Sequence, residues 1–316
     1  MGYMSTGFAR AVWVWNTSSV LSSPNGINAL LTGAQKIEIS DVYLYMAPSW
    51  YSQQRPALRN LITNATATGI RVWALDGDRA YLDDAAGPTD FYAGIDDLIA
   101  YNQDVAVSAR FHGFQADVEP QDHGTHKCFH NDIADSALST EPGSGVWQRS
   151  QAQDREMLMR SWLTIHQTAS KRLRAQGLQF GAAMPFWTES YHGGEVQVAF
   201  PSNVNTRQGV MKYMMPLLDE YVVMSYNTTP SNAASRVAVQ AAYASTLPVE
   251  FRPRVYGSME VTTGVGTNVS YADTPGKNSK AVVLQDMGTI IETLSQYRAF
   301  KGMALEHWSS LEAMPD

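Results

Sequence analysis

The 316-residue sequence has a single cysteine, Cys128, so no disulfide can form within the chain. Its longest apolar runs fall well short of the roughly 20 residues that span a bilayer, which argues against a membrane partner. The net charge of −7 includes no block of like charge, which argues against nucleic acid as the main partner. Fixed-period repeats, low-complexity tracts and composition breaks are also missing, so we expect one domain.

Several catalytic signatures are missing as well. There is no Gly-x-Ser-x-Gly elbow of a serine hydrolase, and no glycine-rich phosphate loop follows the first strand pattern. Cys128 lacks a convincing context for a thiol nucleophile. No organic cofactor is therefore implied.

Short apolar runs supply the main structural signal. Hydrophobic residues make up 44% of the chain and charged residues 17%, which is enough for a sizeable core. The runs predict eight strands, at 10–15, 41–46, 71–77, 113–119, 180–185, 221–227, 254–261 and 302–308. The clearest helical patterns between them cover 55–69, 91–103, 151–177 and 280–302.

Strands that alternate with helices pair in parallel through right-handed crossovers. Eight such units in about 300 residues predict a single-domain (β/α)8 barrel, with a long loop after the fourth strand at about 120–150. A doubly wound open sheet is the alternative, but it lacks the usual glycine-rich loop.

The ends of the predicted strands differ in character. In (β/α)8 barrels the site lies at the carboxyl ends of the strands. Those ends carry Trp15, Asn16, Asp76, Asp117, Glu119, Trp187, Tyr226, Asn227, Glu260, Glu306, His307 and Trp308. The opposite ends carry mainly arginine, glycine and apolar residues. This asymmetry predicts a polar, aromatic site at the carboxyl end of the barrel.

Asp117 and Glu119 end the fourth strand pattern two residues apart, so they face the same way. A carboxylic acid held near apolar groups and a second carboxylate has a raised pKa. Such a group can protonate a glycosidic oxygen. The alternative is that both carboxylates cap loop amides or pair with an arginine such as Arg110.

The stretch "HGFQADVE" (112–119) resembles the strand-four signature of family 18 glycoside hydrolases, the chitinase family, which reads Asp-Gly-x-Asp-x-Asp-x-Glu. Gly113, Asp117 and Glu119 match it, whereas His112 and Gln115 replace its first two aspartates. Two further motifs, "MSYN" (224–227) and "GMALEHW" (302–308), resemble the Met-x-Tyr-Asp of strand six and the tryptophan of strand eight in that family.

The resemblance implies substrate-assisted hydrolysis, in which the acetamido group of an N-acetylhexosamine attacks its own anomeric carbon. Glu119 would be general acid and then base, while Asp117 would orient the acetamido group and Tyr226 would hydrogen-bond to it. Trp308 would form the floor of the sugar subsite. Gln115 can only hydrogen-bond where the family has an aspartate. The substrate-binding residues that we expect are Trp15, Asp76, Gln115, Trp187, Asn227, His307 and Trp308.

Other interpretations stay open at this point. Glu260 can act as the nucleophile of a retaining glycosidase with Glu119 on a neutral glycan, or as a hydrogen-bonding residue at the rim. Asp76 can bind sugar hydroxyls or shape the turn with Gly77. His307 can line the pocket wall or be a buried histidine with satisfied hydrogen bonds. The aromatic strand ends can also bind sugar without cleavage, as in a lectin-like barrel.

The segment "QDHGTHKCFHND" (121–132) holds His123, His126, Cys128 and His130. Such density can bind zinc and would support a metal-dependent hydrolase, but the spacing matches no closed structural zinc pattern. We expect no metal and interpret the segment as part of a loop that covers the substrate.

The sequence has no basic, then apolar, leader at its start, but it has Asn-x-Ser/Thr sequons at Asn16, Asn64, Asn227 and Asn268. We expect a secreted or extracytoplasmic protein whose signal peptide is not part of this sequence, and a cytoplasmic location stays open. The oligomeric state cannot be read from the sequence.

Overall fold

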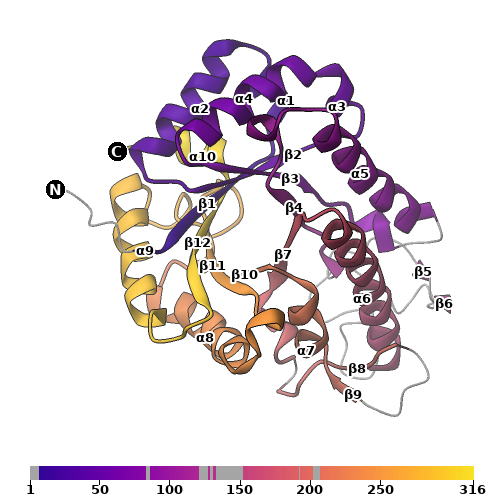
Figure 1. Ribbon diagram of the computed structural model, residues 1–316. Coiled ribbons are helices and arrows are strands. Elements are labelled where there is room, and N and C mark those ends of the chain that lie inside the picture. Colours follow the sequence, from indigo (N-terminus) through magenta and orange to yellow (C-terminus); the bar gives the residue numbers. More distant parts are fainter. Residues whose placement is uncertain are drawn as a thin grey trace.

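The computed structural model describes residues 7–82, 86–120, 127–128, 131–132, 152–191, 193–201 and 207–316. A closed barrel of eight parallel strands lies at its centre, and helices surround the barrel (Figure 1). The strands are β1 (Ala9–Val14), β2 (Asp41–Tyr45), β3 (Arg71–Asp76), β4 (Gly113–Ala116), β7 (Gln179–Pro185), β10 (Glu220–Met224), β11 (Arg254–Glu260) and β12 (Phe300–Glu306). The predicted (β/α)8 barrel is confirmed.

The helices cover the outside of this barrel. They are α1 (Thr17–Leu21), α2 (Pro24–Lys36), α3 (Trp50–Gln53), α4 (Arg55–Ala67), α5 (Ala86–Gln103), α6 (Ala152–Ala175), α7 (Val210–Met214), α8 (Pro230–Thr246), α9 (Lys280–Leu294) and α10 (Trp308–Ala313). Two small antiparallel sheets add β5 (Lys127–Cys128) with β6 (Asn131–Asp132), and β8 (Gln197–Ala199) with β9 (Arg207–Gly209). In the part of the chain that is described, no helix is long and apolar enough to cross a membrane.

Several predicted boundaries are wrong by three residues or more, including the two that follow. The strand expected at 113–119 ends at Ala116, although the Asp117 amide still donates to the Asp76 carbonyl at 2.9 Å. The helix expected at 280–302 ends at Leu294, because a turn follows and β12 already begins at Phe300. Most of the loop predicted at about 120–150 lies outside the described residues.

Side chains alternate between two faces along each strand, as the pleat requires. The outward set packs against the helices in the main core. The inward set is rich in aromatic rings, with Trp13, Tyr43, Trp73 and Tyr256 among its buried members. Gly113 makes room for them, because a Cβ there would lie 2.7 Å from the Trp73 ring. The barrel interior is therefore a packed core that supports the carboxyl end from below.

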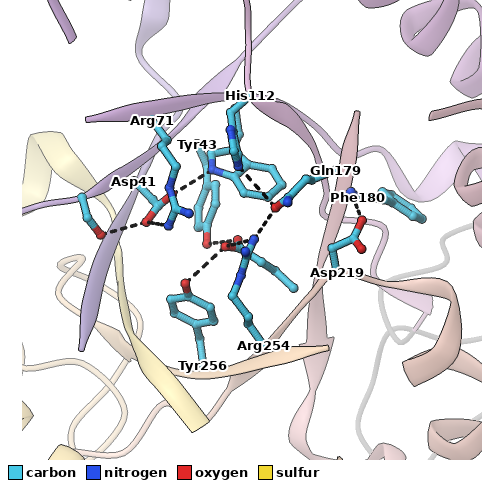
Figure 2. A network of polar contacts seen from close by, with 12 residues as sticks. Asp41, Tyr43, Arg71, His112, Gln179, Phe180, Asp219, Arg254 and Tyr256 are labelled. Carbon is cyan, nitrogen blue, oxygen red and sulfur yellow. Dashed lines mark hydrogen bonds and ion pairs between the residues drawn. The ribbon is translucent and has the colours of Figure 1, made fainter. Parts of the chain in front are cut away.

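The amino-terminal end of the barrel holds a buried polar network (Figure 2). Asp41 accepts hydrogen bonds from Arg71 at 2.7 Å and from the Trp73 indole at 2.9 Å. At the start of β7, Gln179 contacts His112 at 3.2 Å and also accepts a hydrogen bond from Arg254. The expectation that this end carries mainly arginine, glycine and apolar residues is therefore wrong.

Glu220 is the second buried carboxyl group of this network and is fully inaccessible to solvent. It accepts hydrogen bonds from Tyr43 at 2.9 Å, Arg254 at 3.0 Å and Tyr256 at 3.2 Å. Burial, helped by the charge of Asp41 and opposed by Arg254, raises the pKa of Glu220 to about 7. Carboxyl protonation is thus coupled to folding at this position.

We expect Glu220 to make stability fall with rising pH. Its stabilising contribution is complete below its unfolded pKa of about 4.5 and is lost as pH rises through about 7, because the folded state holds the proton longer. The Glu220→Gln variant should lack this loss, which is on the order of 3 kcal/mol. Urea unfolding of both proteins between pH 4 and pH 8 measures it. Parallel pH curves for the two proteins would contradict the assignment.

Candidate active site

The carboxyl end of the barrel gathers four acidic side chains. Glu260 and Glu306 end β11 and β12 and are register partners on these neighbouring strands. Asp117 and Glu119 follow β4. The charges of Asp117, Glu260 and Glu119 all act on Glu306, so we call these four residues the acid cluster.

Tyr226 follows β10 and faces the same cluster. Burial raises its pKa well above the usual value, and the charges of Glu306, Asp117, Glu260 and Glu119 add to the effect. Asp117, Glu119 and Glu260, the other three residues that we predicted as catalytic, therefore lie near enough to Tyr226 for their charges to act on it.

Two members of the acid cluster hold their protons more tightly than free carboxylic acids do. Burial, and then the charges of Asp117 and Glu260, raise the pKa of Glu306 well above its usual value. Burial also raises the pKa of Glu260, although the Thr262 amide donates to its Oε1 at 2.7 Å and opposes the shift. A site of this kind keeps carboxylic acid protons available for transfer.

Trp15 connects β1 to the cluster. Its indole Nε1 donates a hydrogen bond to Glu306 Oε1 at 2.8 Å. The Trp15 ring also packs against Tyr45, with 5.6 Å between ring centroids. Trp15 therefore contacts the acid cluster through the edge of its indole ring.

A cavity of about 300 Å³ adjoins the cluster. Its described lining residues combine a carboxyl group, aromatic rings, apolar side chains and one cation: Glu119, Pro185, Phe186, Trp187, Met224, Tyr226, Arg236 and Val269. Two predicted catalytic residues and the predicted substrate-binding residue Trp187 thus share one hollow.

The position of Trp308 contradicts the prediction that its ring forms the floor of the sugar subsite. Its side chain is buried in the main core, and its ring lies over Gly33 of α2, where an added Cβ would come within 2.4 Å of it. Trp308 begins α10, which packs on the outside of β1 and β12. Its ring therefore lies away from the acid cluster and acts in packing.

Asp76 also lies apart from the cluster. Trp73 and Leu75 point into the barrel, so Asp76 points outward between β3 and α5, where Tyr81 donates to it at 2.8 Å. Its carboxyl oxygen lies near Gly94, and burial raises its pKa to about 6. The prediction that Asp76 binds sugar hydroxyls is therefore not supported by its position.

Asn227 and His307 have local hydrogen-bond partners, whereas the side-chain amide of Gln115 has none among the described residues. Asn227 Oδ1 accepts from the Thr229 amide at 2.9 Å in the turn before α8. His307 Nδ1 lies 2.9 Å from Ser309 Oγ at the start of α10. Gln115 points into the barrel beneath Asp117, fully buried, beside Gly181. The structure places none of these three in the wall of the 300 Å³ cavity.

Two residues gain importance only in the folded structure. Glu306 is recognised from sequence as a strand-end residue without a chemical role, yet it is central to the acid cluster. Arg236 lies on a helix and is therefore missed when strand ends alone are inspected. The position of Glu306, level with Glu260 at the end of the next strand, is the sequence signal that could have found it.

No group of metal-ligating side chains suitable for a metal ion occurs among the residues that the structure describes. The zinc alternative depends on the side chains of His123, His126, Cys128 and His130, which lie outside the described part of the structure.

Comparisons with known proteins define the fold. No protein-family model and no curated protein matches the sequence. Among solved structures, a chitinase from Chromobacterium violaceum matches with a TM-score of 0.51 and 12% identity over 98% of this chain and 95% of its own.

Two further solved structures show the same barrel. A class V chitinase mutant from Cycas revoluta in complex with (GlcNAc)3 matches with a TM-score of 0.50 and 11% identity over 97% of both chains. Saccharomyces cerevisiae Gas2p, as a mutant in complex with laminaritetraose and laminaripentaose, matches with a TM-score of 0.51 and 8% identity over 96% of this chain and 57% of its own. The chain therefore has the barrel fold that these glycosidases use, while identities this low leave its substrate and catalytic residues to be inferred from the site.

Proposed function

We propose that this protein is a glycoside hydrolase that cleaves a polysaccharide containing hexosamine. The main support is that Glu119 lines a cavity of about 300 Å³ with aromatic walls and also belongs to the acid cluster. A proton donor beside a hollow that can hold a sugar ring is what glycosidic cleavage needs.

In this proposal Glu119 donates its proton to the glycosidic oxygen as the bond to the leaving sugar breaks. Asp117, one pleat below on the same face, orients the acetamido group whose oxygen attacks the anomeric carbon. Tyr226 donates a hydrogen bond to that group. Glu119 then takes a proton from water, which opens the cyclic intermediate and restores the acid.

The acid cluster also supports a second route. Glu260 lies in the same cluster as Glu119 and could attack the anomeric carbon directly on a neutral glycan. Only this route works without an acetamido group, so the substrate itself distinguishes the two.

The test is a reducing-end release assay on chitin, peptidoglycan, galactosamine-containing and neutral polysaccharides, with the Glu119→Gln protein as the blank. Cleavage of an acetamido polymer alone would support the substrate-assisted route. Cleavage of a neutral glycan would indicate that Glu260, and not the acetamido group of the substrate, is the nucleophile. No release from any polymer, together with binding to one of them, would replace the proposal with a lectin-like barrel.

We expect Glu306 to act as a neutral carboxylic acid, because its pKa is raised well above the usual value. Glu306→Gln keeps an acceptor for the Trp15 indole and should retain turnover within about threefold near pH 6. Glu306→Ala leaves that indole without its partner and should lower turnover about tenfold or more. Kinetics of both variants from pH 4 to pH 9 provide the measurement. A loss in Glu306→Gln as deep as that in Glu306→Ala would show that the ionised form is needed.

A further inference from the structure

Arg236 is the one cationic side chain among the described residues that line the cavity beside Glu119. It comes from α8, and its guanidinium carbon lies 4.2 Å from the centroid of the Phe186 ring. Its Nη1 donates to the Tyr226 carbonyl oxygen at 2.5 Å. Stacking and this single hydrogen bond hold the guanidinium at the edge of the cavity.

The charge of Arg236 has no carboxylate partner within the described part of the chain. Two other partly buried arginines do have one, since Arg71 pairs with Asp41 and Arg254 with Glu220. Burial lowers the pKa of Arg236, and no acid among the described residues opposes the effect. A guanidinium has five N–H donors, and Arg236 uses one of them within the part of the chain that the structure describes. Removing a cation from water without pairing it is costly, which favours an anionic ligand at this position.

The rest of the cavity suits a sugar ring. Phe186 and Trp187 offer aromatic surface, and Met224 and Val269 add apolar contacts. A volume of about 300 Å³ is at the lower end for ligand pockets, as expected for one sugar unit. A carboxylate on that sugar could accept two parallel hydrogen bonds from the guanidinium edge.

We propose that this cavity binds a carboxylate-bearing sugar unit, so that the substrate is an acidic polysaccharide and Arg236 is its recognition residue. The inference rests on the proposed glycosidase function and names its substrate class. A neutral sugar would leave the guanidinium unpaired once water is displaced, so the same residue selects against neutral glycans.

The test is calorimetric binding to the Glu119→Gln protein, which binds without turnover. The probes are two acidic tetrasaccharides, one from hyaluronan and one from peptidoglycan glycan strands, each beside its carboxyl-reduced form. We expect at least one acidic member to bind about tenfold tighter than its reduced form. Adding Arg236→Gln should remove that preference and leave the reduced form within about threefold.

Arg252→Gln is the matched control. Arg252 is also a half-buried arginine, and among the described residues it bonds only to a backbone carbonyl, that of Leu247, but it lies before β11 at the opposite end of the barrel. This control should leave the preference unchanged. Arg236→Lys, which keeps the charge, should retain part of it, and thermal unfolding verifies that each variant is folded.

Equal affinity for the acidic and reduced members would overturn the inference, as would an equal loss for both in Arg236→Gln. Absence of binding by every probe would overturn it too. The proposed function is judged separately, by reducing-end release from the polysaccharide panel. If the protein cleaved a neutral polymer and showed no preference for acidic sugars, the proposed glycosidase function would stand. Only the inference that its substrate is acidic would then be wrong.

Discussion

Replacing Glu119 by glutamine should lower turnover by about a thousandfold or more on whichever polysaccharide the wild-type protein cleaves. General acid catalysis contributes about 10²–10⁴ in rate, and an amide has no proton to give to the glycosidic oxygen. Glutamine has nearly the same shape, so the cavity walls at Trp187 and Tyr226 stay in place. Binding of the same glycan should therefore stay within a few-fold, which separates a catalytic role from a binding role.

Asp76→Asn is the control for the Glu119 experiment. It makes the same acid-to-amide change at another carboxyl group near a strand end, but Asp76 points away from the acid cluster and bonds to Tyr81. Turnover in this control should stay within about threefold of wild type. Measuring kcat and KM for both variants at several pH values completes the comparison. If Glu119→Gln kept more than about a tenth of the activity, the assignment of the acid would be wrong.

The barrel itself could be predicted from the sequence because its signal is local. Eight short apolar runs, each bounded by turn residues, correspond to the eight observed strands with shifts of a few residues. Parallel pairing then brings all the carboxyl ends to one face, which is why Asp117, Tyr226 and Glu260 could be grouped without coordinates. Strand order and strand ends together are enough to predict that acidic side chains gather at this face, although not the central place of Glu306 among them.

The direction of individual side chains could not be predicted in the same way. Strands of a parallel sheet are apolar on both faces, so the alternation that turns Asp76 outward is hidden in the sequence. The pairing of Tyr43 with Glu220 joins residues 177 positions apart, and no local pattern reports such a contact. Arg236 reaches the cavity from the second turn of a helix, where an arginine ordinarily indicates an exposed surface.

The direction of the Trp308 side chain was also predicted wrongly from the sequence. Its observed position predicts a large effect on stability when the ring is removed. Trp308→Ala should lower the free energy of unfolding by about 3–5 kcal/mol, because it empties the space that the ring fills between α10 and α2. The KM of the folded fraction should stay within about twofold, since the ring lies away from the cavity. Urea unfolding and steady-state kinetics on the same samples measure both quantities. A raised KM without loss of stability would instead support the prediction that Trp308 forms part of the sugar subsite.

Gly33 allows the packing of Trp308 to be tested by a double-mutant cycle. In the wild-type background Gly33→Ala puts a methyl group within 2.4 Å of the ring and should destabilise the protein by about 1–3 kcal/mol. In the Trp308→Ala background the same methyl group meets empty space, and alanine favours the helix over glycine by up to about 1 kcal/mol. The effect of Gly33→Ala should thus change sign between the two backgrounds. An equal cost in both would mean that the two residues do not touch, whereas a reversal requires the ring of Trp308 to lie on α2, outside the barrel, where it cannot form the floor of a sugar subsite.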